Sequence, residues 1–232
     1  MVPEVYQQSK AAKDAKAASA IWKTKFKKMR KIIRGGGKRF DDTLAEIRAI
    51  DDPLAALAFA DALESSRSGK AENQEMRLLY VRKLGQFRNR DSVKTLVEAG
   101  LYEPDGLIRS EALTQLQEYG APSAVASYLS IVRSKKSSPA MVTAALRGLT
   151  YFPEPELWRD YVNALTPVHQ TVAPPGPGMQ AGMSNLGGAG MAMGGGKPVV
   201  RQNTVQNPDA LTLLKAIAPD VDLRYDESAW RQ

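Results

Sequence analysis

The chain has 232 residues, of which 43% are hydrophobic and 25% are charged, and its formal net charge is +7. This composition falls in the range of globular proteins and excludes a wholly disordered chain. The absence of cysteine excludes disulfides, thiolate metal sites and a cysteine nucleophile.

The positive charge lies at the N-terminal end of the chain. Residues 1–40 contain twelve Lys or Arg and two acidic residues, a local charge of +10, and the other 192 residues therefore carry −3. A basic segment attached to a nearly neutral body indicates that this segment meets an anionic partner.

Residues 1–37 are predicted to form a basic amphipathic helix that acts as an arm. Trp22, Phe26, Met29 and Ile33 fall at i, i+4, i+7 and i+11, a spacing that places them in one apolar stripe along a helix. The glycines at 35–37 are expected to end this helix as a C-cap and hinge.

Three roles for this helix stay open. It could cap the end of the fold, with its stripe packed on the first helical hairpin and its polar face in solvent. It could bind nucleic acid or another polyanion without sequence specificity, because Lys and Arg neutralise phosphates. It could lie on an anionic membrane surface, since its narrow apolar face contains Trp and Phe. The candidate polyanion-binding residues are Lys23, Lys25, Lys27, Lys28, Arg30, Lys31, Arg34, Lys38 and Arg39.

Residues 38–168 are expected to be helical throughout. Leu44, Ile47 and Ile50 recur with helical spacing, and Asp52 followed by Pro53 predicts an N-cap with proline at the first helical position. Runs of Val, Ile and Thr with a period of two are absent from this part of the sequence, which argues against strands.

The same region contains an internal repeat. The segments 76–87, 108–119 and 141–152 align without gaps at offsets of 32 and 33 residues, and the segments that follow each of them align at the same offsets. One aligned apolar column consists of Leu84, Leu116 and Leu149. A helix–turn–helix unit that recurs in this way cannot bury its own apolar stripe, and it is therefore expected to stack on the next unit.

These segments resemble HEAT repeats of the short bacterial type over about residues 40–166. The sequence IRSEALTQL, at 108–116, is similar to the second helix of such a repeat, and Arg77 and Arg109 stand where these helices often carry arginine, whereas Val142 departs from the pattern. The resemblance implies an all-α fold, a short right-handed α-solenoid of HEAT-like helical hairpins with a basic N-terminal helix. The alternative is a helical bundle in which the similarity of the segments is fortuitous.

Residues 169–206 form a Gly-, Pro- and Met-rich segment. It is expected to be a flexible insertion, because it buries too little apolar surface to offset its ordering entropy. Residues 207–232 are predicted to form a helix and tail, with Asn207 as N-cap and Pro208 at the first helical position. Its predicted apolar face consists of Leu211, Leu214 and Ile217. Either this helix docks on the last repeat or it is an independent tail helix.

The sequence offers little catalytic chemistry. His169 is the only histidine, and a Ser–His–Asp triad or an HExxH zinc site is therefore not expected. None of the three Gly-Lys pairs is followed by the Ser or Thr that a phosphate-binding loop requires. Some HEAT-like solenoids are enzymes with an acid and aromatic residues in their groove, but Trp158, the residue that would match beside Asp160, falls in an apolar column of the repeat. The chain is therefore predicted to be non-catalytic, with no cofactor and no metal site.

The predicted function is that of a scaffold or adaptor that binds another protein, since a short solenoid offers an extended concave surface. Nucleic-acid binding through the basic helix and the solenoid groove is the runner-up, and a HEAT-like enzyme comes third. No signal peptide or membrane-spanning segment is visible in the sequence, which favours the cytoplasm. An exported chain whose signal had been removed would look the same.

Overall fold

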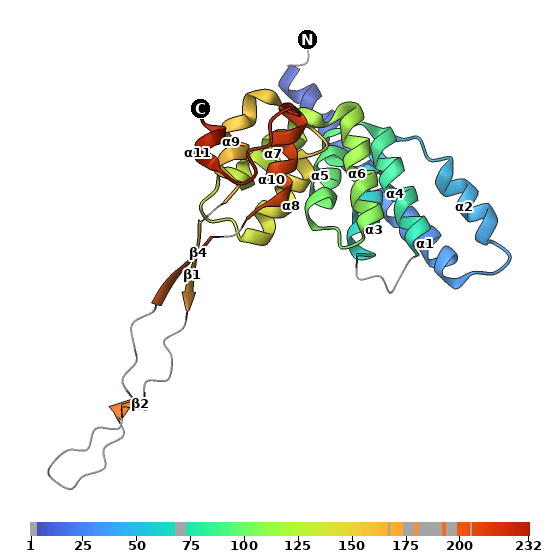
Figure 1. Cartoon of the computed structure of the whole chain (residues 1–232). Helices are drawn as coiled ribbons and strands as arrows, with labels where there is room; N and C mark the ends of the chain where they lie inside the picture. Colours follow the sequence, from blue (N-terminus) through green and yellow to red (C-terminus); the bar gives the residue numbers. More distant parts are fainter. Residues whose placement is uncertain are drawn as a thin grey trace, which may run out of the picture. The chain divides into compact units, whose positions relative to one another are not determined.

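Figure 1 shows the computed structural model of the chain, coloured from the N-terminus to the C-terminus. The structure describes the backbone of residues 4–67, 73–166, 168–173, 179–180, 192–193, 199–204 and 206–232, and the side chains of residues 13–67, 73–166 and 206–232. Helices make up most of this part of the chain, which confirms the predicted all-α class. The chain divides into two compact units, Met1–Glu154 and Pro155–Gln232.

The first unit begins with four helical elements. They are α1 (Glu4–Gly35), α2 (Phe40–Arg48), the 3-10 helix η1 (Pro53–Ala55) and α3 (Ala56–Ser65). Gly36 and Gly37, with φ angles of 63° and 90°, adopt the left-handed backbone that glycine favours, and the predicted C-cap is confirmed. Asp52 is the predicted N-cap and accepts the backbone amide of Leu54, although the turn that it caps is 3-10 before it becomes α-helical.

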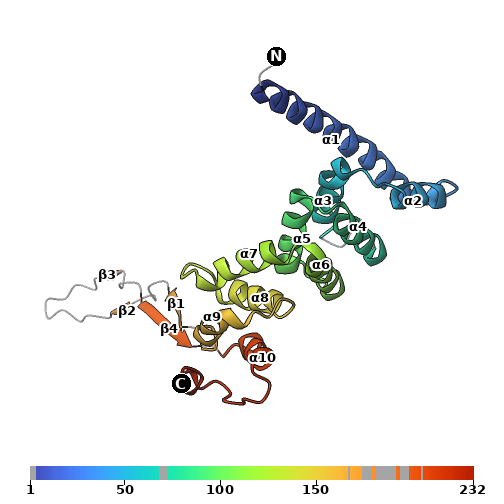
Figure 2. The same cartoon turned by 90° about the horizontal axis from the view of Figure 1, so that it is seen from above.

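The helix α1 packs on α3 through the apolar stripe that the sequence predicts. The most buried residues of the stripe are Phe26, Met29 and Ile33. The ring of Phe26 lies 4.3 Å from the ring of Phe59 on α3, and the indole N–H of Trp22 donates a hydrogen bond of 2.6 Å to the carboxylate of Asp52. Figure 2 shows the first turns of α1 extending beyond α3. This packing on the helices that follow is the arrangement expected of a capping helix, one of the three roles that the sequence left open.

Five further helices follow in the first unit. They are α4 (Gln74–Phe87), α5 (Arg90–Tyr102), α6 (Gly106–Tyr119), α7 (Ala121–Arg133) and α8 (Pro139–Leu149). Asn73, Asp105 and Ser138 cap α4, α6 and α8, and each side chain accepts a backbone amide of the first turn. These caps are separated by the offsets of the sequence repeat, and the repeat therefore also determines where these helices begin.

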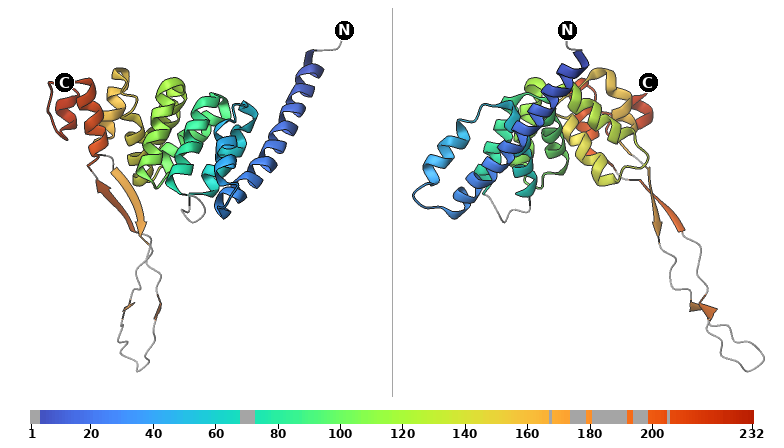
Figure 3. Two further views of the ribbon diagram at one scale, coloured as in Figure 1. Left: turned by 90° about the vertical axis from the view of Figure 1, so that its right-hand side faces the viewer. Right: turned by 180° about the vertical axis from the view of Figure 1, so that it is seen from behind.

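Neighbouring helices of this region pack against one another. The helix α4 contacts α6, α5 contacts both α3 and α7, and α7 contacts α8 (Figure 3). The predicted column of Leu84, Leu116 and Leu149 is fully buried at all three positions. The alignment fails at the start of α8, where Val142 is buried and Met141 is only half-buried.

Polar contacts connect residues that lie about one repeat apart. The guanidinium of Arg82 donates to Glu111 at 3.1 Å, and the hydroxyl of Tyr128 donates to the carbonyl of Val97 at 3.2 Å, across 29 and 31 residues of sequence. The amide of Gln117 donates to the carbonyl of Tyr151 at 2.7 Å, across 34 residues. Each successive hairpin therefore makes both apolar and polar contacts with the one before it.

The second unit is built on a pair of helices. Its helical elements are η2 (Pro155–Leu157), α9 (Trp158–Asn163), α10 (Pro208–Ile217) and α11 (Glu227–Trp230). The helix α10 packs on α9, and the backbone amide of its N-cap, Asn207, donates to the carbonyl of Leu165 at 2.8 Å. The predicted cap is confirmed, and of the two alternatives left open by the sequence, the helix lies packed on the helix that precedes the insertion. Leu213 is buried beside Leu214, whereas Leu211 is only half-buried, and the buried face therefore differs from the predicted one.

The ends of the predicted insertion pair with each other between α9 and α10. The strand β1 (Val168–Ala173) runs antiparallel to β4 (Val199–Thr204), with Val168 opposite Thr204. The two-residue strands β2 (Met179–Gln180) and β3 (Ala192–Met193) form a second pair. These ladders were not predicted, although β-branched Val and Thr in β1 and β4 favour strands. The rest of the predicted flexible segment 169–206, apart from residue 206, lies outside the described residues.

Candidate protein-binding groove

The basic residues of α1 form one wall of a depression between α1 and α3. This cationic depression has a volume of about 510 Å³. It is lined by Lys23, Phe26, Lys27, Arg30, Lys31 and Arg34 of α1 and by Ala58, Asp61 and Ser65 of α3. Five of these nine side chains are cationic, and the single acid, Asp61, forms an ion pair of 2.9 Å with Lys23. The depression therefore keeps a strong excess of positive charge.

Helical spacing explains which basic residues line the depression. Lys23, Lys27, Arg30 and Arg34 follow one another at intervals of three or four residues, and Lys31 lies four residues after Lys27 and three before Arg34, which places all five on one side of the helix. Lys25 and Lys28 lie between them in the sequence, are exposed, and do not line the depression. The basic residues of α1 thus divide into a groove-facing set and a set on the other side of the helix.

Arg30, one of the residues that line the cationic depression, is held in place by hydrogen bonds to α3. Its guanidinium donates a hydrogen bond of 3.0 Å to the hydroxyl of Ser65 and one of 3.4 Å to the carbonyl of Ala62. The same group lies 6.0 Å from the centre of the Tyr80 ring. Because this side chain is already ordered, an anion that meets it costs less conformational entropy than one that meets a mobile lysine.

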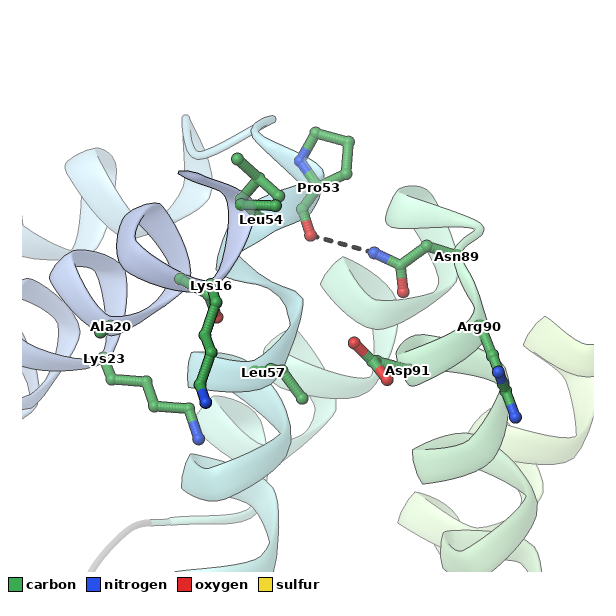
Figure 4. Close-up of a pocket in the computed structure, with 11 residues that line it drawn as sticks. Lys16, Ala20, Lys23, Pro53, Leu54, Leu57, Asn89, Arg90 and Asp91 are labelled. Carbon is green, nitrogen blue, oxygen red and sulfur yellow. Dashed lines mark hydrogen bonds between the residues drawn. The ribbon is translucent and has the colours of Figure 1, made fainter. Parts of the chain in front are cut away.

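A second depression, of about 520 Å³, continues from the first one. This middle depression is lined by Ala15, Lys16, Ser19, Ala20 and Lys23 of α1, by Pro53, Leu54 and Leu57 of η1 and α3, and by Asn89, Arg90 and Asp91 at the start of α5. Figure 4 shows Lys16 and Lys23 on one side, Asp91 on the other, and Leu57 between them. The middle depression is therefore apolar at its centre and carries charges of both signs at its rim.

A third depression, of about 560 Å³, lies between α5 and α7. The residues that line this α5–α7 depression are Arg90, Val93, Lys94, Val97, Glu98, Leu101 and Tyr102 of α5 and Ser123 and Ser127 of α7. Three aliphatic side chains form its apolar part, and the Tyr102 side chain beside them is 47% exposed. The opposite charges of Lys94 and Glu98 lie one turn apart, and with Arg90 the lining carries a net charge of +1, against +4 in the cationic depression.

The three depressions adjoin one another. Lys23 lines both the cationic and the middle depression, and Arg90 lines both the middle and the α5–α7 depression. We call the surface formed by these three adjoining depressions the groove. It extends over α1, α3, α5 and α7, all in the first unit, and it changes from strongly cationic at α1 to mostly apolar at α7.

The structure brings together five of the nine basic residues that the sequence singled out. Lys38 and Arg39 follow the glycine hinge, are exposed, and line none of the three depressions. Sequence reasoning missed the α5 contribution, because Val93 and Val97 belong to the apolar columns of the repeat and were assigned to the core. A valine that lines both the core and a surface groove has the same sequence pattern as one that lines the core alone.

The two arginines of the resemblance meet at one buried acid. A guanidinium nitrogen of Arg77, on α4, lies 2.6 Å from a carboxylate oxygen of Glu103, at the C-terminal end of α5. Arg109, on α6, donates a hydrogen bond of 2.7 Å to the backbone carbonyl of the same Glu103. Glu103 is 1% and Arg77 is 4% exposed. The three residues of this Glu103 cluster line none of the three depressions and join three helices, which makes the cluster a structural feature.

Metal binding and membrane insertion find no support in the part of the chain that the structure describes. Within the side chains described, no three His, Asp or Glu residues gather in a way that could hold a metal ion. None of the described helices combines the length and the apolar character that crossing a bilayer requires. His169 lies in β1, and its side chain is outside the described residues.

Comparison of the chain with protein-family models, with curated proteins and with solved structures gives no match. The geometry of the groove is therefore the basis on which a function is assigned.

Proposed function

We propose that this chain is a non-catalytic adaptor, a short right-handed α-solenoid of HEAT-like hairpins that binds a partner protein through the groove. The solenoid interpretation is supported by helix N-caps at the repeat offsets and by hydrogen bonds that span 29 to 34 residues. These are the contacts expected when each hairpin stacks on an equivalent neighbour. The arginines at positions 77 and 109 support the HEAT-like assignment within that class.

The observation that carries the adaptor function is the continuity of the groove over four helices. Its three depressions share Lys23 and Arg90 and combine apolar lining with charged rims. Protein interfaces have this composition, with an apolar centre that excludes water and a polar rim that fixes register. Tyr102 gives the groove an exposed aromatic residue, the type that most often contributes strongly to binding energy.

Site-specific crosslinking tests this function. A photo-reactive amino acid placed at Tyr102 in the full chain is expected to crosslink to a partner protein in the native cell. Thr114, an exposed residue of α6 that lines none of the three depressions, provides the matched control position. A protein captured at position 102 but not at position 114 supports the groove as the binding surface, and equal capture at both positions or capture at neither overturns it.

Polyanion binding by α1 is the second candidate function. The observation that favours it is the density of exposed cations on α1 and the turn after it, where Asp14 is the single acid among residues 13–39. If about six of these cations contacted DNA phosphates, the logarithm of the affinity would fall with the logarithm of salt concentration with a slope of about −5. A slope near zero would remove this candidate.

Attachment of α1 to a membrane surface has less support than either of these candidates. The stripe that would enter the lipid is occupied by packing on α3, with Phe26 1% exposed. Among the described residues of α1, Ile21 is the large apolar side chain that stays exposed. An interfacial helix needs a whole apolar face to enter the headgroup region, and one isoleucine does not provide it.

A further inference from the structure

The groove has a direction, because its two ends differ in charge and in polarity. At the α1 end the cationic depression has five cationic side chains and one acid. At the α7 end the α5–α7 depression has Val93, Val97, Leu101 and Tyr102 in its lining, together with two serines of α7 and a net charge of +1 from Arg90, Lys94 and Glu98. A ligand that matches both ends must itself be anionic at one end and apolar at the other.

We propose that the occupant of the groove is an acidic segment of a partner protein, with its Asp and Glu residues in the cationic depression and its apolar residues against the α5–α7 depression. This proposal rests on the adaptor function and adds the chemistry and the orientation of the partner. Asp61 already shows how a carboxylate is held there, through its ion pair of 2.9 Å with Lys23. Arg30, ordered by Ser65 and Ala62, offers a second fixed cation to an incoming carboxylate.

The apolar half of the groove favours a protein segment over nucleic acid. A nucleic-acid strand carries phosphate charge along its whole length, and it gains nothing from an aliphatic lining at one end of the site. Base stacking along a strand requires a series of accessible aromatic faces. Beside the cations of α1, Phe26 is buried and Trp22 is half-buried, with its indole hydrogen-bonded to Asp52 and Lys25 4.8 Å from its ring centre. Tyr102 is the one exposed aromatic residue that lines the groove, and it lies at the other end. An apolar side chain of a peptide, in contrast, gains free energy by leaving water against the half-buried Val93 and Leu101.

A peptide-binding experiment with charge-matched variants tests the proposal. The probe is a fluorescein-labelled peptide of about 20 residues, the size of one side of a standard interface. One half carries Glu and the other half carries Leu and Phe, and a scrambled peptide of the same composition is the control ligand. Binding to the full-length chain is measured by fluorescence anisotropy, with a DNA duplex as competitor.

The decisive variants are two double charge reversals on the same helix. K27E/K31E changes two residues that line the cationic depression, and K25E/K28E makes the same change in net charge with two exposed residues outside it. K27E/K31E is expected to weaken peptide binding at least about tenfold, and K25E/K28E less than about threefold, because only the first pair places like charge against the peptide. Y102A at the apolar end is expected to weaken binding about fivefold.

Several results would overturn the proposal. Equal loss in both charge reversals, equal affinity for the scrambled peptide, or no binding of the probe would each do so. Preferential binding of the duplex, with equal sensitivity to both charge reversals, would assign α1 to nucleic acid. Concentration-dependent self-association of the chain that is lost in K27E/K31E would identify a second copy as the occupant.

The adaptor function can survive the failure of this proposal. If crosslinking at Tyr102 captures a partner but the acidic peptide does not bind, the partner is not acidic and the adaptor function stands. If crosslinking at Tyr102 captures nothing and the peptide does not bind, both proposals fail. All four substituted lysines are exposed, and an unchanged urea midpoint for each variant shows that the fold is retained.

Discussion

The first unit contains two buried clusters that each join three helices by different physical means. The Glu103 cluster joins α4, α5 and α6 through the ion pair with Arg77 and the hydrogen bond from Arg109. The Tyr128 cluster joins α5, α7 and α8, because the fully buried Tyr128 side chain places its ring against Gly148 and its hydroxyl against Gly100. The Glu103 cluster depends on a buried ion pair, and the Tyr128 cluster depends on close packing against glycines, which have no side chain.

The difference between the two clusters shows how helices can stay packed where one repeat lacks the arginine that the other two carry. The aligned positions 77, 109 and 142 carry Arg, Arg and Val, and α8 therefore cannot extend the ionic arrangement. At α8 the contact with the preceding hairpin is made by Gly148, whose missing Cβ leaves room for the Tyr128 ring. Apolar close packing replaces a buried ion pair at the next junction.

Removing the acid of the Glu103 cluster is expected to have the largest effect. Glu103→Ala leaves the guanidinium of Arg77, which is 4% exposed, buried without its counter-ion. Breaking a buried pair from one side costs about 3–5 kcal/mol, because the remaining charge has lost its compensation. Urea unfolding followed by circular dichroism measures this loss.

The matched control replaces both partners of the ion pair. The double variant R77M/E103L removes the charges together and keeps the site filled, and its expected cost is under about 2 kcal/mol. If Glu103→Ala alone were as stable as the wild type, Arg77 would have another route to solvent or to a partner, and the cluster would not be a structural junction.

A methyl group added at Gly148 is expected to have the second-largest effect. The Cβ of alanine at this position would lie 2.5 Å from Cε2 and 2.8 Å from Cδ2 of the Tyr128 ring, and the ring or the helix must therefore move. Overpacking typically costs about 1–3 kcal/mol, partly offset by the roughly 1 kcal/mol by which alanine exceeds glycine in helix propensity. We expect Gly148→Ala to lower the free energy of unfolding by up to about 2 kcal/mol in the same urea experiment.

A double-mutant cycle separates this clash from other effects of the substitution. In a Tyr128→Leu background the ring is absent, and Gly148→Ala is expected to be neutral or to stabilise the protein through helix propensity. An equal cost in both backgrounds would mean that the tyrosine ring is not what requires glycine at this position.

The features that the sequence predicts correctly are mostly local. Asp52 and Asn207 cap their helices, and Gly36 and Gly37 end α1, because a cap or a left-handed turn depends on a few neighbouring residues. The leucine column is also predictable, since helical periodicity and the repeat both place its members inside. The same helical periodicity explains why five of the nine candidate cations lie on one side of α1, whereas their role in binding stays a prediction.

The features that were missed depend on residues far apart in the sequence. Glu103 carries no pattern of its own, and its role arises only because Arg77 and Arg109, on two other helices, meet it. The apolar end of the groove could not be predicted from the sequence either, because it forms only when α5 and α7 pack side by side. The β1–β4 ladder joins segments separated by the Gly- and Pro-rich insertion, and strand pairing at such a distance has no local signal.

Removing the helix N-caps near the two clusters is expected to lower the stability by a smaller amount, which differs less from one site to the next. Asn73→Ala and Asp105→Ala act near the Glu103 cluster, and Ser138→Ala acts at the start of α8. Each removes one acceptor of backbone amides and is expected to cost about 1 kcal/mol, measured as a shift of the urea midpoint. Asp105→Ala should cost the most of the three, because its carboxylate accepts two amides of α6 and the side-chain amide of Gln74. Equal costs for all three would show that these additional bonds contribute nothing.

A change of pH is expected to have the smallest effect on the free energy of unfolding as long as the pH stays near neutral. At alkaline pH, the tyrosine of the Tyr128 cluster is expected to contribute to the change. Burial raises the pKa of the Tyr128 phenol above its ordinary value of 10.0 and raises the pKa of Tyr119 to about 12. A raised pKa means that the folded state holds the proton more tightly than the unfolded state. The resulting contribution to stability is complete below pH 10 and is lost as the pH rises through the folded-state pKa.

Lys83 changes the stability with pH in the opposite direction, and it does so below pH 10.5. Burial lowers its pKa from 10.5, although Asp51 opposes the shift, and its contribution is complete above pH 10.5 and is lost as the pH falls through the lowered value.

Two variants separate these contributions. Tyr128→Phe removes the phenol that resists ionisation, and its urea midpoint should fall less steeply than that of the wild type above about pH 10. Lys83→Met removes the opposing group, and its midpoint should lose the rise with pH that Lys83 produces below 10.5 while keeping the alkaline fall. The hydroxyl of Tyr128 donates to the carbonyl of Val97, and the phenylalanine variant therefore also loses about 1 kcal/mol at neutral pH. A parallel alkaline fall in wild type and Tyr128→Phe would show that the tyrosine joins α5 to α7 through its ring alone, with its proton playing no part in the stability of that junction.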